Sequence, residues 1–398
     1  MEFRNLLSTI FGNNHAPINL ENAQLINSFN SLITNYNSEI YNDLTVRACV
    51  DTIARHISKL KPVHIIKDED GRHLQNTKIN VLLGSRPNIY MSTSDFLYKM
   101  TSQLLYYGNS FIYLQKDNKG SIIGFYPINF ATCELKEVDN SLYLKFNFYT
   151  GKTIAVPYSD IIHIRRNFSS HDFLGQDAYQ PLKETLVNLF KARQSISNKV
   201  ENSGKLSGVL KIKGNVGQEN WITQAKLFAN NFMSFSNDTG GIAAVDSSTD
   251  FVPITNKVES AEDAQLKYLQ SEVYSYFGLT ESIITGNYTE TEWQAFYESI
   301  IETIKIQLSQ EFTAKVFTDQ ERQYGNIIDF NSNRLTYAST ANKVSMIKEL
   351  GALGLLTTNE ARELFDLSPV EDGDKRLVSL NYINAAKADE YQLNKEKE

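Results

Sequence analysis

Two helices separated by a short polar segment, residues 258–318, constrain the fold of this chain more than any other stretch. The second helix opens with the capping box Thr289-x-x-Glu292, in which two side chains satisfy free backbone amides. It contains no Pro and no Gly, so we predict a stiff rod of roughly 45 Å. Its apolar residues recur at three- and four-residue steps: Trp293, Phe296, Ile300, Ile304, Leu308, Phe312 and Val316. This pattern predicts a long helix buried along one side.

Residues 41–180 have the pattern of an α+β domain. Asn42 or Asp43 caps a first helix, and the capping box Ser92-x-x-Asp95 begins another. The apolar period then changes from 3.6 to 2, which predicts six strands: residues 111–115, 122–127, 133–138, 142–148, 153–157 and 161–166. Short strands joined by tight turns predict an antiparallel sheet packed on the preceding helices.

The next part of the chain, residues 181–257, is predicted to form a helix and a small insert. The helix, 181–204, has Arg193 on its apolar stripe, and we expect the charged end of this side chain to reach solvent. The β-rich insert, 205–257, contains one helix, and its core is too small for the insert to fold alone. We expect neighbouring chains to cover its aromatic side chains: Trp221, Phe228, Phe232 and Phe235.

The two ends of the chain carry weaker signals. Residues 1–40 are rich in Asn and Ser with weak periodicity, which predicts a partly disordered arm. Residues 335–398 predict a helical region with a capping box at Thr357-x-x-Glu360 and a mobile, charged tail.

Composition bounds the partners of the chain. The net charge of −7 predicts poor non-specific affinity for DNA, so any nucleic-acid contact has to be local. The two cysteines, in dissimilar contexts, indicate a reducing compartment rather than a disulfide scaffold. No run approaches the ~20 apolar residues of a membrane span. We therefore expect a cytoplasmic protein with no membrane partner.

No motif forms a complete catalytic or cofactor site. Residues 151–153 (Gly-Lys-Thr) resemble the end of a phosphate-binding loop, but Phe146 stands where that loop needs glycine. Residues 238–240 (Asp-Thr-Gly) match the tripeptide of aspartic proteases, and a homodimer could supply the second copy. A hydrolase that uses Asp238 is therefore a less favoured alternative. The six histidines have no metal-binding spacing. We expect no enzyme activity, no cofactor and no metal.

Five stretches, taken in order, carry a resemblance to one family. They are Asn42 to Ala54; Tyr107-Gly108-Asn109-Ser110-Phe111; Asp160-Ile161-Ile162-His163-Ile164-Arg165, with Gly175 in the following linker; Phe277-Gly278-Leu279-Thr280; and Gly354 to Arg362. With the long helix in its place, they resemble the portal proteins of tailed double-stranded DNA bacteriophages, in the shorter family. The resemblance spans about Asp43 to Asn381. It departs at Thr280-Glu281, where the family usually has proline.

The resemblance implies an α+β, portal-type fold: an α/β wing, a two-helix stem, a small β-rich clip, a long spoke helix and a helical C-terminal crown. It implies these bounds: arm 1–40, wing 41–180, first stem helix 181–204, clip 205–257, second stem helix 258–278, tunnel loop 279–288, long wing helix 289–334 and crown 335–398.

The same resemblance implies a homo-oligomeric ring, usually of twelve subunits, at one capsid vertex of the virion. Such a ring is the channel for packaging and ejecting double-stranded DNA, without reading its sequence. Its implied protein partners are the terminase large subunit, the head–tail adaptor and the major capsid protein, and it assembles in the cytoplasm of the host bacterium. Another oligomeric phage connector or adaptor is an alternative reading, although adaptors usually lack a long spoke helix.

Candidate site residues follow from this resemblance. The tunnel loop would face DNA with uncharged side chains: Thr280, Ser282, Thr285 and Asn287. A basic set near the junction of stem and clip either lines the channel or is ordinary solvated surface: Lys199, Lys205, Lys211 and Lys213. The aromatic residues of the clip helix, Trp221, Phe228 and Phe232, would take part in clip interactions.

Overall fold

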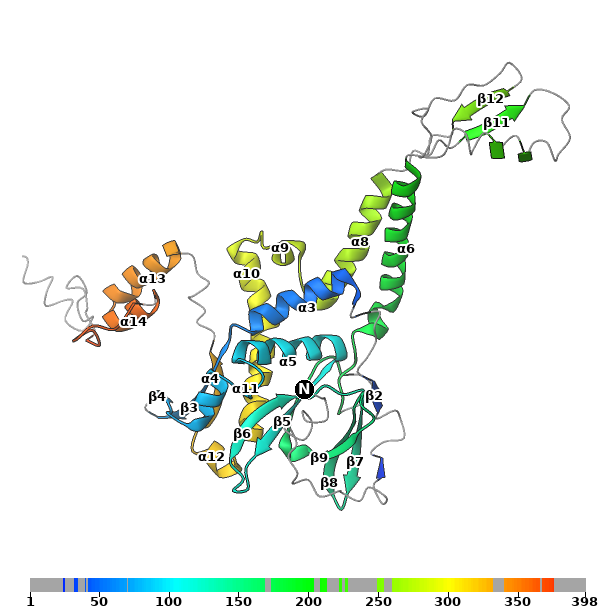
Figure 1. The fold of residues 1–398 in the computed structure, drawn as a ribbon. Helices are drawn as coiled ribbons and strands as arrows, with labels where there is room; N and C mark the ends of the chain where they lie inside the picture. The colour runs from blue at the N-terminus through cyan, green and yellow to red at the C-terminus, as the bar shows by residue number, and fades with distance from the viewer. Residues whose placement is uncertain are drawn as a thin grey trace, which may run out of the picture. The chain divides into compact units, whose positions relative to one another are not determined.

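The computed structural model describes residues 24–25, 32–34, 40, 42–69, 71–168, 173–203, 208–212, 222–223, 226–227, 249–253, 260–331, 340–365 and 367–375 (Figure 1). The chain divides into two compact units, residues 1–59 with 63–328, and residues 60–62 with 329–398. Most of the arm 1–40 and of the insert 205–257 lies outside the described part.

Two helices of the larger unit begin where the capping signals predict, and they pack against each other. In α3 (Leu44–Ile57), the Asp43 carboxylate accepts the backbone amides of Thr45 and Val46 at 2.8 and 3.0 Å. The predicted capping box at Ser92 and Asp95 begins α5 (Thr93–Tyr107). A further short helix, α4 (Lys78–Gly84), was not predicted.

All six predicted strands form, and they pair antiparallel, but they build two sheets rather than one. The first sheet, in the order β10-β5-β6, contains β5 (Asn109–Lys116), β6 (Ile122–Pro127) and β10 (Ile161–Arg165). The second contains β7 (Thr132–Val138), β8 (Ser141–Asn147) and β9 (Thr153–Pro157), with β1 (Gln24–Leu25) and β2 (Leu32–Thr34) both paired to β7.

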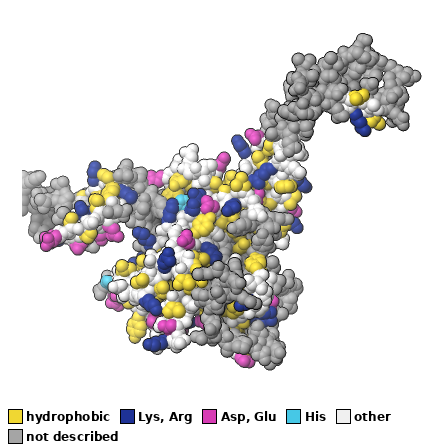
Figure 2. Space-filling view, in the orientation of Figure 1, with side chains coloured by type: hydrophobic (Ala, Val, Ile, Leu, Met, Phe, Trp, Pro, Cys, Tyr) yellow, Lys and Arg dark blue, Asp and Glu magenta, His cyan; other side chains and the backbone are white. Residues whose placement is uncertain are grey.

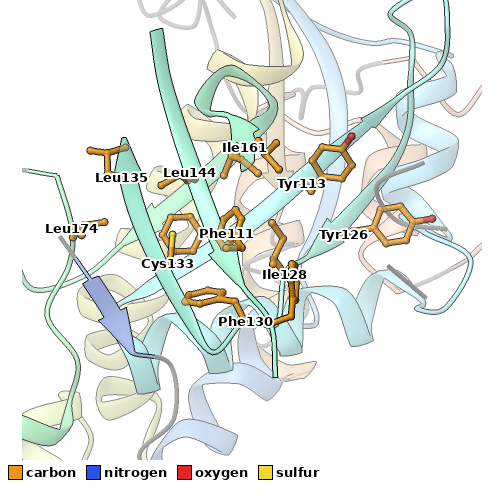
Figure 3. Packing of buried hydrophobic residues seen from close by; sticks show 13 residues of the cluster. Phe111, Tyr113, Tyr126, Ile128, Phe130, Cys133, Leu135, Leu144, Ile161 and Leu174 are labelled. Carbon is orange, nitrogen blue, oxygen red and sulfur yellow. The ribbon is translucent and has the colours of Figure 1, made fainter. Parts of the chain in front are cut away.

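Burial on both faces of the first sheet explains the split. The first six positions of β5 are buried, so each face needs a cover. On one face, Phe125 stacks on Phe312 of the long helix at 5.8 Å. On the other, Phe111 meets Phe130 and Phe146 in a cluster shared with the second sheet (Figure 3). A single flat sheet would leave one of these faces exposed.

A third sheet has the strand order β13-β3-β4. It contains β3 (Lys61–Asp68), β4 (Gly71–Leu74) and β13 (Asn326–Asn331). Before β13 stands α12 (Asp319–Gln323), which is capped by a Thr318–Glu321 box.

Two antiparallel helices, α6 (Tyr179–Ser203) and α8 (Ser260–Phe277), lie side by side in Figure 1. The charged end of Arg193 in α6 was predicted to reach solvent, but it is paired with residues at the start of α3. Its guanidinium donates to Asp43 at 2.8 Å and to the Thr45 hydroxyl at 2.6 Å. The side chain is 33% exposed and that of Asp43 is 13% exposed. The arginine therefore ties α6 to the capped end of α3.

The predicted rod is helical throughout, but not regular. It consists of α10 (Glu290–Phe296), a π-helical turn η2 (Tyr297–Ile301) and α11 (Glu302–Val316). Apolar residues spaced by four drift about 40° per step around an α-helix of 3.6 residues per turn. A π turn holds more residues and so offsets part of this drift. Phe296, Leu308 and Phe312 are all buried.

The other elements are short. The β11 strand (Gly208–Ile212) pairs antiparallel with β12 (Thr249–Pro253). The smaller unit contains α13 (Thr340–Ala352) and α14 (Thr358–Glu363), and α14 begins with the predicted capping box at Thr357 and Glu360.

Candidate functional site: the segment between α8 and α10

The segment 279–288, predicted as a loop, contains a short helix, α9 (Glu281–Thr285). Leu279 and Ile283 are buried and anchor the segment, and α9 packs against α3 and α10. Three of the four predicted channel residues, Thr280, Thr285 and Asn287, are exposed, and Ser282 is partly exposed. The segment therefore combines an apolar anchor with uncharged polar side chains that solvent can reach.

Two glycines in the left-handed region flank α9, Gly278 (φ 72°) and Gly286 (φ 80°). At Gly278 the end of α8 closely approaches the π turn. A Cβ atom built there would lie 2.6 Å from Cδ1 of Ile300. Glycine satisfies both the backbone angle and this contact.

Glu292 holds α9 against the start of the long helix. Its carboxylate accepts the Thr289 amide at 2.7 Å and the Thr289 hydroxyl at 2.9 Å, which completes the capping box. It also accepts the Ser282 hydroxyl at 2.9 Å. These hydrogen bonds, first that of the Thr289 backbone, lower the pKa of Glu292. One charged carboxylate therefore serves both the helix cap and the preceding segment.

Aromatic side chains pack together where this segment joins α10. Tyr288 stacks on Trp293 at 5.4 Å, and the His56 ring of α3 lies 4.7 Å from Trp293 and 5.5 Å from Phe296. Burial, followed by the charges of Lys59 and Arg55, lowers the pKa of His56 to about 4. The ring is therefore neutral at pH 7, and its buried Nδ1 has no partner among the described residues.

Residues of two stretches that carry the family resemblance meet in one buried cluster, which we call the motif cluster: Gly108, Asn109, His163 and Gly175. The Asn109 amide donates to the carbonyl oxygens of Tyr107 (3.0 Å) and Gly175 (2.7 Å). Its Oδ1 atom accepts the Gly175 amide at 2.9 Å and Nε2 of His163 at 3.0 Å. The polar atoms of the buried Asn109 side chain are thus fully used.

The tautomer of His163 follows from these partners. Burial and the charges of Arg165 and Lys315 hold the pKa of His163 well below its usual value, so the ring is neutral. Since Oδ1 of Asn109 can only accept, Nε2 carries the proton. Nδ1 then accepts the Tyr158 hydroxyl at 3.3 Å.

The chain that leaves the motif cluster contacts both α8 and α11. Arg166 donates to the Tyr276 carbonyl at 3.1 Å, and its guanidinium lies 5.5 Å from the centre of the Phe277 ring. Gln307 of α11 donates to the Arg165 carbonyl at 2.9 Å. The first sheet, the end of α8 and the long helix therefore meet immediately before the candidate segment.

Two of the other predicted site residues lie on described elements. Lys211 is exposed on β11, opposite Asp250 of β12. The backbone of Lys199 lies in α6. Outside the described residues lie Lys205, Lys213, Trp221, Phe228, Phe232 and Asp238.

The described residues contain no group of three or more His, Cys, Asp or Glu side chains placed to hold a metal ion. Cys49 and Cys133 are buried and free, and burial raises the pKa of Cys49 to about 12. Within the same residues, no helix combines the length and apolar character that crossing a membrane requires.

Comparisons with known proteins all identify portal proteins as similar to this chain. A model of the phage portal protein family matches residues 44–366. The chain is 21% identical to the portal protein of Enterobacteria phage HK97, over 85% of this chain and 82% of that protein. It is 23% identical to a probable portal protein of Lactococcus phage p2, over 61% of this chain, and this match spans 65% of the Lactococcus phage protein.

Two solved structures share the fold. The neck of an empty gene transfer agent particle, computed with C6 symmetry, matches with a TM-score of 0.60 and 15% identity over 83% of this chain and 92% of that one. The crystal structure of an HK97-family phage portal protein from Corynebacterium diphtheriae matches with a TM-score of 0.51 and 11% identity, over 75% of this chain and 96% of that one. The family match and the shared fold together define a phage portal component. The chain belongs to the phage portal protein family.

Proposed function

We propose that this chain is one subunit of a ring, at one vertex of a virion, through which double-stranded DNA is packaged and ejected. The observation that carries the proposal is the candidate segment, 279–288. It is fixed by buried Leu279 and Ile283 at the meeting point of α8 and the long helix, and it presents Thr280, Thr285 and Asn287 to solvent. The neck of a native gene transfer agent particle was computed with C12 symmetry, which supports a ring of twelve.

A channel for DNA has to let phosphates pass rather than hold them. Hydroxyl and amide groups touch phosphate or sugar without reading sequence. The net charge of −7 limits non-specific retention. On the face in Figure 2, Lys and Arg side chains are interspersed with acidic and apolar ones rather than gathered in one patch. These features favour sliding over tight binding. Lys199, Lys205, Lys211 and Lys213 are further candidates for the channel wall.

The clip, residues 205–257, is the proposed docking site for the terminase large subunit and later for the head–tail adaptor. Its described strands, β11 and β12, form a two-stranded ribbon, and such a ribbon alone is marginally stable in water. Completion by neighbouring subunits or partners through Trp221, Phe228 and Phe232 would supply the missing contacts. The major capsid protein is the proposed partner of the wing, and assembly is proposed to take place in the cytoplasm of the bacterial host.

A charge change on the candidate segment tests the channel. We expect the double variant Thr285→Lys, Asn287→Lys to form normal rings in electron micrographs, because both side chains are exposed. DNA packaging by assembled particles should slow, most strongly at low salt, because each added lysine attracts phosphate. Ser141→Lys, at an exposed position of β8, is the matched control and should package normally.

Three outcomes bear on the proposal. Equal packaging by the double variant and the control would place the segment away from DNA. Loss of rings in the double variant alone would make the segment structural. A wild-type protein that stays monomeric at high concentration, or that lies in a separate layer below the capsid vertex, would refute the portal assignment and favour another connector.

A further inference from the structure

The Ser and Thr hydroxyl groups of the candidate segment, those of Thr280, Ser282 and Thr285, all donate to groups of this chain. The Thr285 hydroxyl donates to the Glu281 carbonyl at 2.9 Å. The Ser282 hydroxyl donates to the Glu292 carboxylate at 2.9 Å, and the hydroxyl oxygens of Ser282 and Thr280 are 2.8 Å apart. A hydroxyl has one proton to donate. Because the proton of Ser282 goes to Glu292, the proton between the two hydroxyl oxygens belongs to Thr280.

These bonds form a chain from Thr280 through Ser282 to Glu292, and the chain ends on a charge. Hydrogen bonds, first that of the Thr289 backbone, lower the pKa of Glu292, so its carboxylate is charged at pH 7 and can only accept. Its second oxygen accepts the Thr289 amide and hydroxyl, which fixes its position. Hydrogen bonds to a charged acceptor are roughly twice as strong as those between neutral groups. The protons of the two hydroxyls therefore stay directed toward Glu292.

The direction of these hydroxyls decides what the segment offers to DNA. Phosphate oxygens accept hydrogen bonds, so a side chain holds a phosphate only through a donor. Thr280 is exposed and Ser282 is partly exposed. With their protons committed, both hydroxyls present oxygen lone pairs to solvent, and these form no hydrogen bond with phosphate oxygens.

We propose that Glu292 is a positioning residue of the DNA channel, which acts through Ser282 to prevent the hydroxyls of Thr280 and Ser282 from holding the phosphates that pass. The presence of DNA at this segment rests on the proposed function, whereas the direction of the hydroxyls follows from the hydrogen bonds alone. The segment is therefore polar and hydrated, but its hydroxyls do not bind the polymer.

A double-mutant cycle on purified rings tests this role, with the affinity for duplex DNA at low salt as the readout. One change removes both hydroxyls, Thr280→Val with Ser282→Ala, and the other, Glu292→Ala, removes the carboxylate. Loss of the hydroxyls should lower the affinity at least threefold more without Glu292 than with it, because only the freed hydroxyls can donate to DNA. The two rings compared in each background carry the same charge, so the loss of the carboxylate charge cancels.

Ser282→Ala tests the same chain while the cap of α10 stays intact. This substitution removes the acceptor of the Thr280 hydroxyl and frees its proton. The affinity for DNA should therefore rise at least threefold, although a polar group has been deleted, and adding Thr280→Val should reverse the gain. No gain in Ser282→Ala would contradict the proposal.

Thr289→Ala separates the positioning role from a purely structural one. It removes one hydroxyl of the capping box but leaves the hydrogen bond between Ser282 and Glu292. Its rings should bind DNA within twofold of the wild type. A gain as large as that of Glu292→Ala would show that a loosened helix start causes the effect, and would overturn the proposal.

An equal effect of hydroxyl loss with and without Glu292 would also overturn the proposal. The variant Thr285→Lys, Asn287→Lys then shows in the same assay which inference has failed. A rise in its DNA affinity would mean that the segment reaches DNA and that only the role of Glu292 is wrong. No rise would mean that the proposed function fails as well.

Discussion

The substitution Gly108→Ala should destabilise the motif cluster. Gly108 ends α5 with φ 68°, in the left-handed region. A Cβ atom built there would overlap the main chain of Gln176. Because the obstacle is backbone, no side-chain rotation relieves it, and the linker that contains Gly175 has to move away from β5.

The loss in the free energy of unfolding follows from the strained backbone and from the contacts that this movement breaks. A non-glycine residue in the left-handed region costs roughly 1–2 kcal/mol. Moving the linker breaks the two hydrogen bonds between the Asn109 side chain and Gly175, at 2.7 and 2.9 Å, each worth about 1 kcal/mol. The expected loss is therefore about 3–4 kcal/mol, a large part of the roughly 5–15 kcal/mol that stabilises a typical domain.

Gly120→Ala is the matched control for this substitution. Gly120 has φ 82°, and no atom lies within 4 Å of a Cβ built there, so only the backbone term of roughly 1–2 kcal/mol applies. Urea unfolding followed by circular dichroism should therefore show a difference of about 2 kcal/mol between the two variants. Hydrogen exchange at the Gly175 amide should also be faster in Gly108→Ala alone. Equal losses of stability in the two variants would refute the argument.

Three further predictions concern other contacts of the fold. Arg193→Leu should lower the free energy of unfolding by about 2 kcal/mol in urea, because it leaves the carboxylate of Asp43 largely buried without its partner; an unchanged midpoint would contradict the pairing. His56 stays neutral in the folded protein until its pKa of about 4, whereas the unfolded chain takes up the proton near 6.5, so stability should fall as pH falls between these values. His56→Leu should remove about 2–3 kcal/mol of that fall, and parallel pH profiles would exclude the effect. Gly278→Ala should cost about 1 kcal/mol more than Gly286→Ala, whose Cβ meets no atom, and equal midpoints of thermal unfolding would count against a close approach at Gly278.

Much of the secondary structure is written in short-range signals. The capping boxes at Ser92, Thr289 and Thr357 occur in the structure as predicted. A cap needs only residues three positions apart, so no tertiary contact has to be known. The six strands were found for a similar reason, because the alternation of apolar residues depends only on which face is buried. The Thr318–Glu321 box is an equally local signal, but it was not predicted.

Local signals also explain what could be predicted of the candidate segment. The left-handed glycines, Gly278 and Gly286, and the cap at Thr289 mark where the helices end. They do not reveal α9, because a five-residue helix is too short to be stable without the buried contacts of Ile283. Nor do they show that Glu292 binds Ser282 as well as its own cap, since that bond depends on how α9 packs.

The caps, the strand periods and the long apolar stripe could be predicted, because they depend on neighbours along the chain. Three features could not: the division of the strands into two sheets, the π-helical turn of the rod, and the pairing of Arg193 with Asp43 across 150 residues. The packing of distant segments sets all three. It also decided that Asn109, His163 and Gly175 meet in one cluster. Each of these depends on which buried groups are left to satisfy one another once distant segments pack, and spacing along the chain carries no record of that.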